Sequence, residues 1–189
     1  MTQQEVLEIF RMTGALLEGH FILTSGFHSP HYFQCAKVLQ YPKYLTELSG
    51  VIADYFKDDD IDVVLSPAIG GIVLGTEIGR LLNARTIFAE RENNKLTLRR
   101  GFCLSKGLKV LAVEDVVTTG GSVFELIDII KKADCIPAGV GFIIDRSGGV
   151  DFKTKQMSLA KFEVVKFPAT DVPDWLENIP VTKPGSRKS

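Results

Sequence analysis

The sequence predicts an α/β protein with a twisted sheet that is mainly parallel and is flanked by helices. Two observations carry this prediction. Apolar segments of strand length alternate with segments of helical periodicity through the centre of the chain. A turn rich in glycine and hydroxyl groups joins one of these strands to the helix that follows it. In such a sheet the crossovers are right-handed, and ligands bind at the carboxyl ends of the strands.

The first forty residues are predicted to contain one helix followed by turns. Residues 2–11 have helical spacing, with Val6, Ile9 and Phe10 on one face. Residues 19–39 are rich in turns, with short β-like pieces at 21–23 and 31–34. A second helix is predicted after Pro42, where apolar side chains recur at helical spacing.

The central part alternates between strands and helices. Strands are predicted at 62–65, 85–89, 109–113 and 138–144, with a last strand at 162–167. Helices are predicted at 71–82 and 122–133, and Asn93 and Asn94 form a polar turn before a hairpin arm at 96–102. The candidate chemistry should therefore lie just after the strand ends at Leu65, Glu90, Val113 and Ile144. Residues 181–189, which end in GSRKS, are predicted to be a flexible tail.

Composition narrows the class of protein. The chain has 189 residues, enough for one α/β domain with a full core. The net charge of -1 gives no basic footprint for nucleic acid, and no apolar stretch is long enough to span a bilayer. The start, MTQQEVLEIF, does not resemble a signal peptide. Cys35, Cys103 and Cys135 have no metal-binding spacing, which indicates reduced thiols in a cytoplasmic protein.

The segment KVLAVEDVVTTGGSV, residues 109–123, combines two kinds of chemistry. Its apolar strand delivers two adjacent carboxylates, Glu114 and Asp115. Glycines in the following turn let backbone N–H groups approach a ligand, and the helix start adds further N–H donors and partial positive charge. Hydroxyls of Thr118, Thr119 and Ser122 can complete a phosphate cradle. The acids would repel a phosphate but can accept hydrogen bonds from ribose hydroxyls, so the segment suits a ribose 5-phosphate.

A purely structural interpretation of the same segment is a capped helix after a buried strand. Ser122 and Glu125 have the spacing of a capping box. This interpretation leaves the pair of acids unexplained. Two other phosphate-binding patterns, GxxxxGK[ST] and GxGxxG, do not occur in the sequence.

Residues 109–123 resemble the phosphoribosyl pyrophosphate (PRPP) motif of type I phosphoribosyltransferases. The resemblance implies that fold, with a small N-terminal hood at about 1–40, a core at about 41–170, and a single domain over 1–189. It also implies an enzyme in which the two acids are catalytic. The residues expected to bind PRPP are Arg91, Lys95, Glu114, Asp115, Val116, Val117, Thr118, Thr119, Gly120, Gly121 and Ser122.

Three further segments resemble the orotate phosphoribosyltransferases within this family. They are GHFILTSGFHSPHYF at 19–33, LSPAIGGI at 65–72, and the Asp145-Arg146 pair after the strand VGFIID. The resemblance implies transfer of the phosphoribosyl group to orotate, giving orotidine 5′-monophosphate in pyrimidine biosynthesis. Arg146 would bind the orotate carboxylate, because a guanidinium fork matches a carboxylate bidentately. Thr118 would lie near both ligands and is expected to contact orotate as well.

The sequence departs from the family pattern at three places. Many members carry a lysine where this chain has Thr24, and another in the pyrophosphate loop where it has Gly70. The catalytic loop is shorter: Arg91 aligns, Glu92 replaces a cation, and the match of Lys95 depends on the gap chosen. These differences leave open which loop cation reaches the pyrophosphate.

The resemblance also implies Mg²⁺, held mainly through PRPP and without a metal site of the protein's own. Lys95 is expected to be catalytic at the leaving pyrophosphate. The cations at 91, 95, 99 and 100 form a basic cluster, whose alternative interpretation is a solvated hairpin face. A homodimer is expected, with residues 91–100 contributing to the neighbouring site and with no nucleic-acid or membrane partner.

Two alternatives remain open at this level. The chain could be a purine-base phosphoribosyltransferase, which would share the donor site but give Arg146 no carboxylate to bind. It could also be a non-catalytic regulator that keeps the nucleotide-sensing fold. Comparing base acceptors separates the first alternative from orotate transfer, and binding to nucleic acid without turnover would favour the second.

Overall fold

A computed structural model describes residues 1–23, 26–163 and 165–182. Thr24 and residues 183–189, the larger part of the predicted tail, lie outside the described residues. Within the described ranges no helix is long and apolar enough to cross a membrane.

The core is a six-stranded sheet. Its strands are, in spatial order, β5 (Lys95–Leu98), β4 (Arg85–Glu92), β3 (Val63–Pro67), β6 (Lys109–Val117), β7 (Ile136–Asp145) and β8 (Gln156–Lys161). Neighbouring strands are parallel except β5, which returns antiparallel to β4 as the second arm of a hairpin. The predicted α/β fold with a mainly parallel sheet is confirmed.

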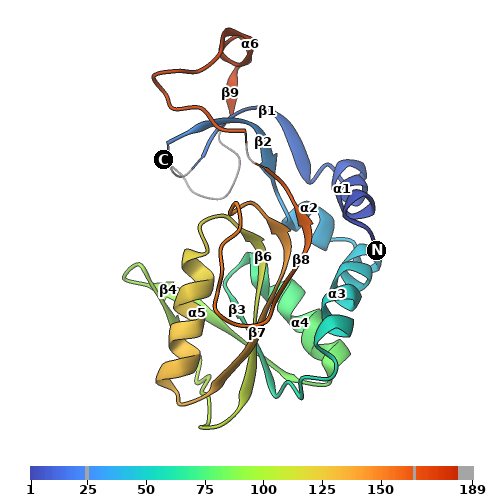
Figure 1. Cartoon of the computed structure of the whole chain (residues 1–189), viewed down its shortest axis with the longest axis vertical. Coiled ribbons are helices and arrows are strands. Elements are labelled where there is room, and N and C mark those ends of the chain that lie inside the picture. Colours follow the sequence, from blue (N-terminus) through green and yellow to red (C-terminus); the bar gives the residue numbers. More distant parts are fainter. Residues whose placement is uncertain (24–25, 164, 183–189) are drawn as a thin grey trace.

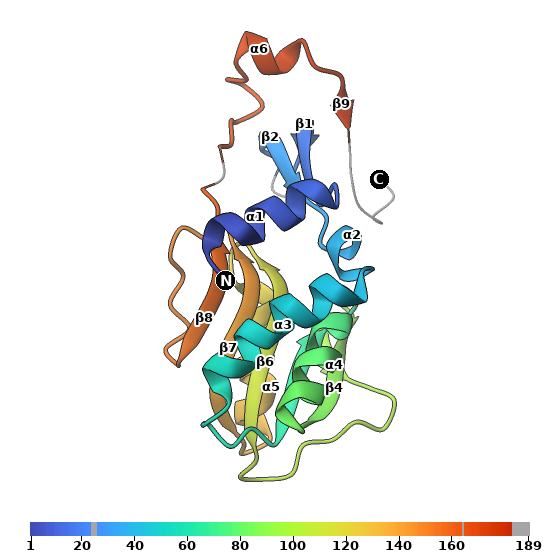
Figure 2. The same cartoon turned by 90° about the vertical axis from the view of Figure 1, so that its right-hand side faces the viewer.

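Helices cover both faces of this sheet (Figures 1 and 2). Helices α3 (Pro42–Phe56) and α4 (Gly70–Leu82) lie on one face, and α5 (Gly121–Lys132) lies on the other. Strand β6 shows why two cores form: Leu111 and Val113 join the cluster under α3 and α4, whereas Val110 and Ala112 join the cluster under α5. This alternation follows from the two-residue period of a strand.

A smaller sheet forms a hood at one end of the molecule (Figure 1). Its strand order is β2 (His28–Phe33), β1 (Leu16–Ile22) and β9 (Val181–Thr182), so the hood takes strands from both ends of the chain. Helix α1 (Gln3–Met12) packs against β1 and β8 and begins with a complete capping box between Thr2 and Glu5. The short helices α2 (Ala36–Leu39) and α6 (Asp174–Glu177) were not predicted.

The predicted last strand at 162–167 is wrong. The sixth strand of the core is β8, which ends at Lys161, and Phe167 forms only an isolated bridge with His28. The apolar residue Phe162 instead packs its ring against those of His31 and Phe33 in the hood. Phe162 and Phe167 therefore contact the hood and lie outside the strands of the main sheet.

Two predicted boundaries also shift near the candidate site. Strand β6 continues to Val117, so both acids belong to the last part of the strand instead of following it. The second hairpin arm ends at Leu98, well before the predicted end at residue 102. Arg100 and Gly101 follow with φ of 56° and 75°, a conformation that does not continue a strand.

Candidate active site

Strand β6 and helix α5 are joined by the turn that the sequence singled out. Gly120 is the N-cap of α5, with φ of 80°. A Cβ atom at this position would lie 2.9 Å from Phe152 Cε1 and 3.2 Å from Val150 Cγ2. Both the backbone angle and the packing therefore require glycine. The turn exposes Thr118 and Thr119 beside the helix start, where the first N–H groups have no partner within the helix.

The capping-box interpretation of Ser122 and Glu125 is wrong. The N-cap is Gly120, and no side chain caps the helix. Ser122 Oγ instead accepts a hydrogen bond from Arg91 Nη2 at 3.3 Å, and Glu125 forms an ion pair with Arg91 at 2.9 Å. The N–H groups of the first turn of α5 thus remain free of side-chain caps.

The two acids lie next to each other and beside the loop after β3. Burial, reinforced by the charge of Asp115, raises the pKa of Glu114 well above its ordinary value. A Cβ atom on Gly70 would lie 2.5 Å from Asp115 Oδ2, so the loop backbone passes directly against this carboxylate. That approach explains the departure at Gly70, because a longer side chain there would collide with Asp115 unless the carboxylate moved.

Arg146 lies at the junction of core and hood. Its backbone N–H donates to Val117 O at 2.8 Å, which sets it beside the start of the glycine turn and close to Thr118. Its guanidinium stacks over the ring of Phe33 with the centroid 5.5 Å away. Its Nε atom is buried without a hydrogen-bond partner among the described residues, and burial lowers the pKa of the guanidinium. A half-buried guanidinium with an unused, buried Nε–H donor is suited to an anionic ligand.

Phe33 is a site residue that sequence reasoning missed. The segment 19–33 was singled out for its resemblance, but no residue of it was predicted to bind a ligand. Phe33 reaches Arg146 from β2 across the junction of hood and core. The aromatic pair Tyr32-Phe33 at the end of that segment was the available signal.

The predicted catalytic loop is a β-hairpin with a two-residue turn. Asn93 and Asn94 have φ of 49° and 63°, as the tight turns of twisted hairpins require. Three cations of the predicted basic cluster are held by carboxylates, in the pairs Arg91–Glu125, Arg99–Glu92 and Arg100–Glu90. Lys95 is exposed beside the turn and forms no ion pair with the described residues.

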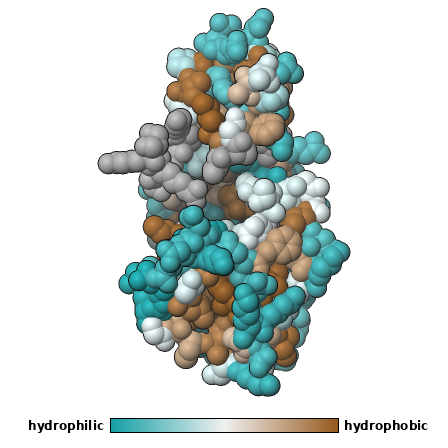
Figure 3. All heavy atoms as spheres, turned by 90° about the vertical axis from the view of Figure 1, so that its left-hand side faces the viewer, coloured by the Kyte–Doolittle hydropathy of each residue, from teal (hydrophilic) through white to brown (hydrophobic). Residues whose placement is uncertain are grey.

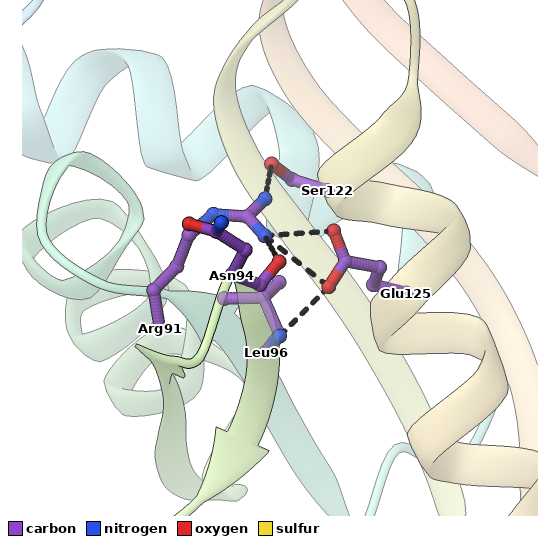
Figure 4. Close-up of polar contacts among 5 residues, drawn as sticks. All are labelled: Arg91, Asn94, Leu96, Ser122 and Glu125. Atoms are coloured by element: carbon purple, nitrogen blue, oxygen red, sulfur yellow. Dashed lines mark hydrogen bonds and ion pairs between the residues drawn. The ribbon is translucent and has the colours of Figure 1, made fainter.

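The structure thus brings the acids, the glycine turn and Arg146 to one end of the sheet. The hairpin tip reaches the same helix start through Arg91, which contacts Glu125 and Ser122 (Figure 4). The surface on the side of α5 and the hairpin is mixed, with apolar areas between polar side chains (Figure 3). Nowhere in the described ranges do three or more His, Cys, Asp or Glu side chains form a group that could hold a metal ion.

Comparison with known proteins agrees with this site. A family model described as "Phosphoribosyl transferase domain" matches residues 35–169. An orotate phosphoribosyltransferase of Chlorobium phaeobacteroides (strain BS1) is 57% identical over 188 residues, which cover 99% of this chain and 97% of that protein. One from Pelotomaculum thermopropionicum is 50% identical over 189 residues and covers 100% of both chains.

Solved structures show the same fold at low identity. The crystal structure of orotate phosphoribosyltransferase from Aeropyrum pernix has a TM-score of 0.72 at 20% identity, covering 82% of this chain and 93% of that chain. An adenine phosphoribosyltransferase from Rhodothermus marinus has a TM-score of 0.68 at 16% identity, covering 84% and 99%. The fold alone therefore does not choose the base.

The sheet, the acidic strand and the glycine turn define a phosphoribosyltransferase domain. At 50–57% identity over nearly its whole length, the chain belongs to the orotate phosphoribosyltransferases. The resemblance inferred from the sequence is confirmed.

Proposed function

We propose that this chain transfers the phosphoribosyl group of PRPP to orotate, giving orotidine 5′-monophosphate and pyrophosphate in pyrimidine biosynthesis. The observation that carries the proposal is the position of the Glu114–Asp115 pair at the end of β6, directly before an uncapped helix start. Carboxylates and free N–H groups in this order match the hydroxyls and the phosphate of a ribose 5-phosphate.

The donor site consists of the acids and residues 116–122. The backbone N–H groups from Thr118 to Ser122 would bind the 5-phosphate, helped by the hydroxyls of that turn. Glu114 and Asp115 would accept hydrogen bonds from the ribose hydroxyls. Loss of pyrophosphate builds positive charge on the ribose ring, and carboxylates close to such a ring stabilise it. The positive charge on the ribose ring would also favour the ionised form of Glu114, whose pKa is raised in the folded protein.

The acceptor site lies between hood and core. The guanidinium of Arg146, stacked on Phe33 with its Nε unused, would bind the orotate carboxylate. Thr118 is the next residue after Val117, to which Arg146 is hydrogen-bonded, so it is within reach of both substrates. Orotate then attacks the anomeric carbon through a ring nitrogen as pyrophosphate leaves, and no covalent enzyme intermediate is required.

Leaving-group stabilisation is assigned to Lys95, because Arg99 and Arg100 are already paired with carboxylates. Arg91, although it is paired with Glu125, would bind PRPP beside Lys95. The ordinary partner of PRPP is Mg²⁺, which would stabilise charge on the pyrophosphate. The carboxylates of Glu114 and Asp115 and the phosphates of PRPP fit this ion, since Mg²⁺ usually binds one or two carboxylates together with substrate phosphates and water. Mg²⁺ would be held mainly through the phosphates of PRPP and not by a metal site of the protein's own.

We further propose a homodimer in which residues 91–100 contribute to the neighbouring site. The exposed position of Lys95 at the hairpin tip supports this arrangement, because its ammonium is free of ion pairs with the described residues of its own chain.

An absorbance assay of orotate consumption with PRPP and Mg²⁺ tests the proposed function. Adenine, guanine and xanthine serve as competing acceptors in a parallel measurement of pyrophosphate release. The proposal predicts turnover with orotate alone among these bases. Turnover with a purine and none with orotate would assign the chain to another acceptor.

A further inference from the structure

The glutamate at position 125 connects three parts of the candidate site through one carboxylate (Figure 4). It lies on the second turn of α5, where the sequence pattern gave it only a capping role. Its Oε1 accepts from Arg91 Nη1 at 2.9 Å, and its Oε2 accepts from the backbone N–H of Leu96 at 2.7 Å. Arg91 precedes the hairpin turn and Leu96 follows it, so the carboxylate holds both arms of the hairpin tip.

Arg91 completes the connection from its own side. Its Nη1 also donates to Asn94 O at 2.9 Å, within the turn, and its Nη2 donates to Ser122 Oγ at 3.3 Å. A guanidinium has five N–H donors in a fixed plane. The Nε–H makes no hydrogen bond with the described residues, so Arg91 keeps donor capacity for an anion.

We propose that Glu125 is a positioning residue that docks the hairpin tip onto α5 and so fixes the orientation in which the tip presents Arg91 and Lys95 to PRPP. The proposal rests on the proposed roles of Arg91 and Lys95 in binding PRPP. Glu125 itself does not contact substrate. It acts by orienting Arg91. It also acts by fixing the distance of the hairpin tip from α5, through its hydrogen bond with Leu96.

Anchoring the hairpin tip would reduce the conformational entropy that it loses when substrate binds. A two-residue turn flanked by polar side chains packs few apolar groups. Within β5, which follows the turn, Leu96 is the only buried residue. Without an anchor such a tip would open locally at small free-energy cost. One carboxylate that accepts both a backbone N–H and a guanidinium removes that freedom before substrate arrives, which lowers the entropy lost on binding.

Two variants of Glu125 separate the two functions of the carboxylate. Glu125→Ala removes both contacts. Glu125→Gln keeps a carbonyl oxygen that can accept from Leu96 but loses the charge that orients Arg91. The matched control is Asp128→Ala on the same helix, because the ion pair of Asp128 is with Lys132, at 3.3 Å, and no hydrogen bond or ion pair joins it to the hairpin within the described residues.

Amide hydrogen exchange of the 91–98 segment and steady-state kinetics are measured on each variant of the full chain. For Glu125→Ala we expect exchange about tenfold faster and a KM for PRPP about tenfold higher, with the KM for orotate within about twofold of the original. Glu125→Gln should raise the KM for PRPP while exchange stays closer to the unaltered protein. Asp128→Ala should change neither quantity.

The double variant that combines Glu125→Gln with Arg91→Gln decides whether Glu125 acts through Arg91. The proposal predicts that adding Glu125→Gln to Arg91→Gln leaves the KM for PRPP unchanged. A second rise of the same size would mean that Glu125 binds substrate directly and would overturn the proposal. It would also be overturned if Glu125→Ala, or Glu125→Gln should the alanine variant not fold, matched Asp128→Ala in both readouts.

Hydrogen exchange separates this proposal from the proposed function. If the unaltered protein consumed no orotate, the function would be wrong, whereas exchange at 91–98 would still report whether Glu125 docks the hairpin.

Discussion

Arg146 is the residue on which we propose that the choice of acceptor depends. It is held by its own backbone bond to Val117 and by stacking on Phe33, while its buried Nε has no partner among the described residues. A buried donor without a partner costs free energy, on the order of 1–3 kcal/mol. An orotate carboxylate would supply the missing acceptor, whereas adenine, which carries no carboxylate, would not.

Replacement of Arg146 by alanine is therefore expected to act on one substrate. A charge-assisted hydrogen bond contributes roughly 1.5–3 kcal/mol, so the KM for orotate should rise by roughly 10- to 100-fold. The KM for PRPP should change by less than about threefold, because the acids and the glycine turn remain. Equal effects on both substrates, measured by varying each at saturation of the other, would remove Arg146 from the acceptor site.

Glu114 gives a prediction about pH. Burial, and then the charge of Asp115, raise its pKa in the folded chain above the unfolded value. Its ionised form is therefore disfavoured by folding, and the stability present at low pH is lost as pH rises through the raised pKa. The Glu114→Gln variant avoids this loss and should be increasingly more stable than the unaltered protein as pH increases across that range, while turnover falls.

Urea unfolding at a series of pH values measures this difference. The exposed surface change Glu8→Gln serves as the control for loss of a carboxylate. A stability difference for Glu114→Gln that stays constant with pH would show that the folded environment does not shift the ionisation of Glu114.

At the scale of elements, the strand–turn–helix unit of β6 and α5 carries the proposed donor site. Gly120 is the residue that lets the strand pass into the helix, since its φ of 80° and the close approach of Phe152 both exclude a side chain. The next glycine is different, because a Cβ on Gly121 would meet only Thr119 Oγ1, at 3.6 Å. The two glycines thus form a matched pair for testing the turn.

Gly120→Ala should destabilise the chain by about 2–4 kcal/mol, from the left-handed backbone and the collision with Phe152 combined. It should also weaken binding of PRPP, since the N–H groups of the turn would move. Gly121→Ala should cost less than about 1 kcal/mol of stability. Denaturant unfolding of both variants checks the difference, and equal losses would argue against the geometry of the turn.

The same elements show how far sequence reasoning reaches. The alternating strands and helices of the core, and the turn at 118–122, were predicted because apolar period and glycine chemistry are local signals. Residues 156–161 and 162–167 both mix apolar and polar side chains, and only their neighbours in space decide that β8 pairs with β7. For Glu125 the sequence offers only the alternative interpretation of a capping box, because local spacing gives no sign of Arg91, which lies 34 residues away. Contacts between hood and core, such as Phe33 with Arg146, are equally non-local.

At the scale of the whole molecule, the hood closes over one end of the core sheet and both chain ends contribute to it (Figure 2). The proposed acceptor side includes Arg146, which stacks on Phe33 of the hood, while the proposed donor side lies on β6 and α5 of the core. The hairpin tip with Lys95 is the remaining part, and the proposed dimer would place it in the neighbouring site.

Mixing two defective variants tests that arrangement. Lys95→Ala should lower kcat by roughly 10²–10³, as expected for loss of one electrostatic stabiliser, and Arg146→Ala impairs the other side of the site. If Lys95 serves the neighbouring subunit, random mixing of the two variants should restore about a quarter of the sites. If activity of the mixture stays at the level of the separate variants, Lys95 acts within its own chain or not at all.

The central claim is that the turn at 118–122 binds the 5-phosphate of a ribose whose hydroxyls meet Glu114 and Asp115. A crystal structure of the chain with orotidine 5′-monophosphate tests it most directly. The account predicts the phosphate within hydrogen-bond distance of the N–H groups of that turn, the ribose hydroxyls on the two acids, and the base carboxylate on Arg146. A nucleotide bound elsewhere, or a turn filled by the protein's own side chains, would contradict it.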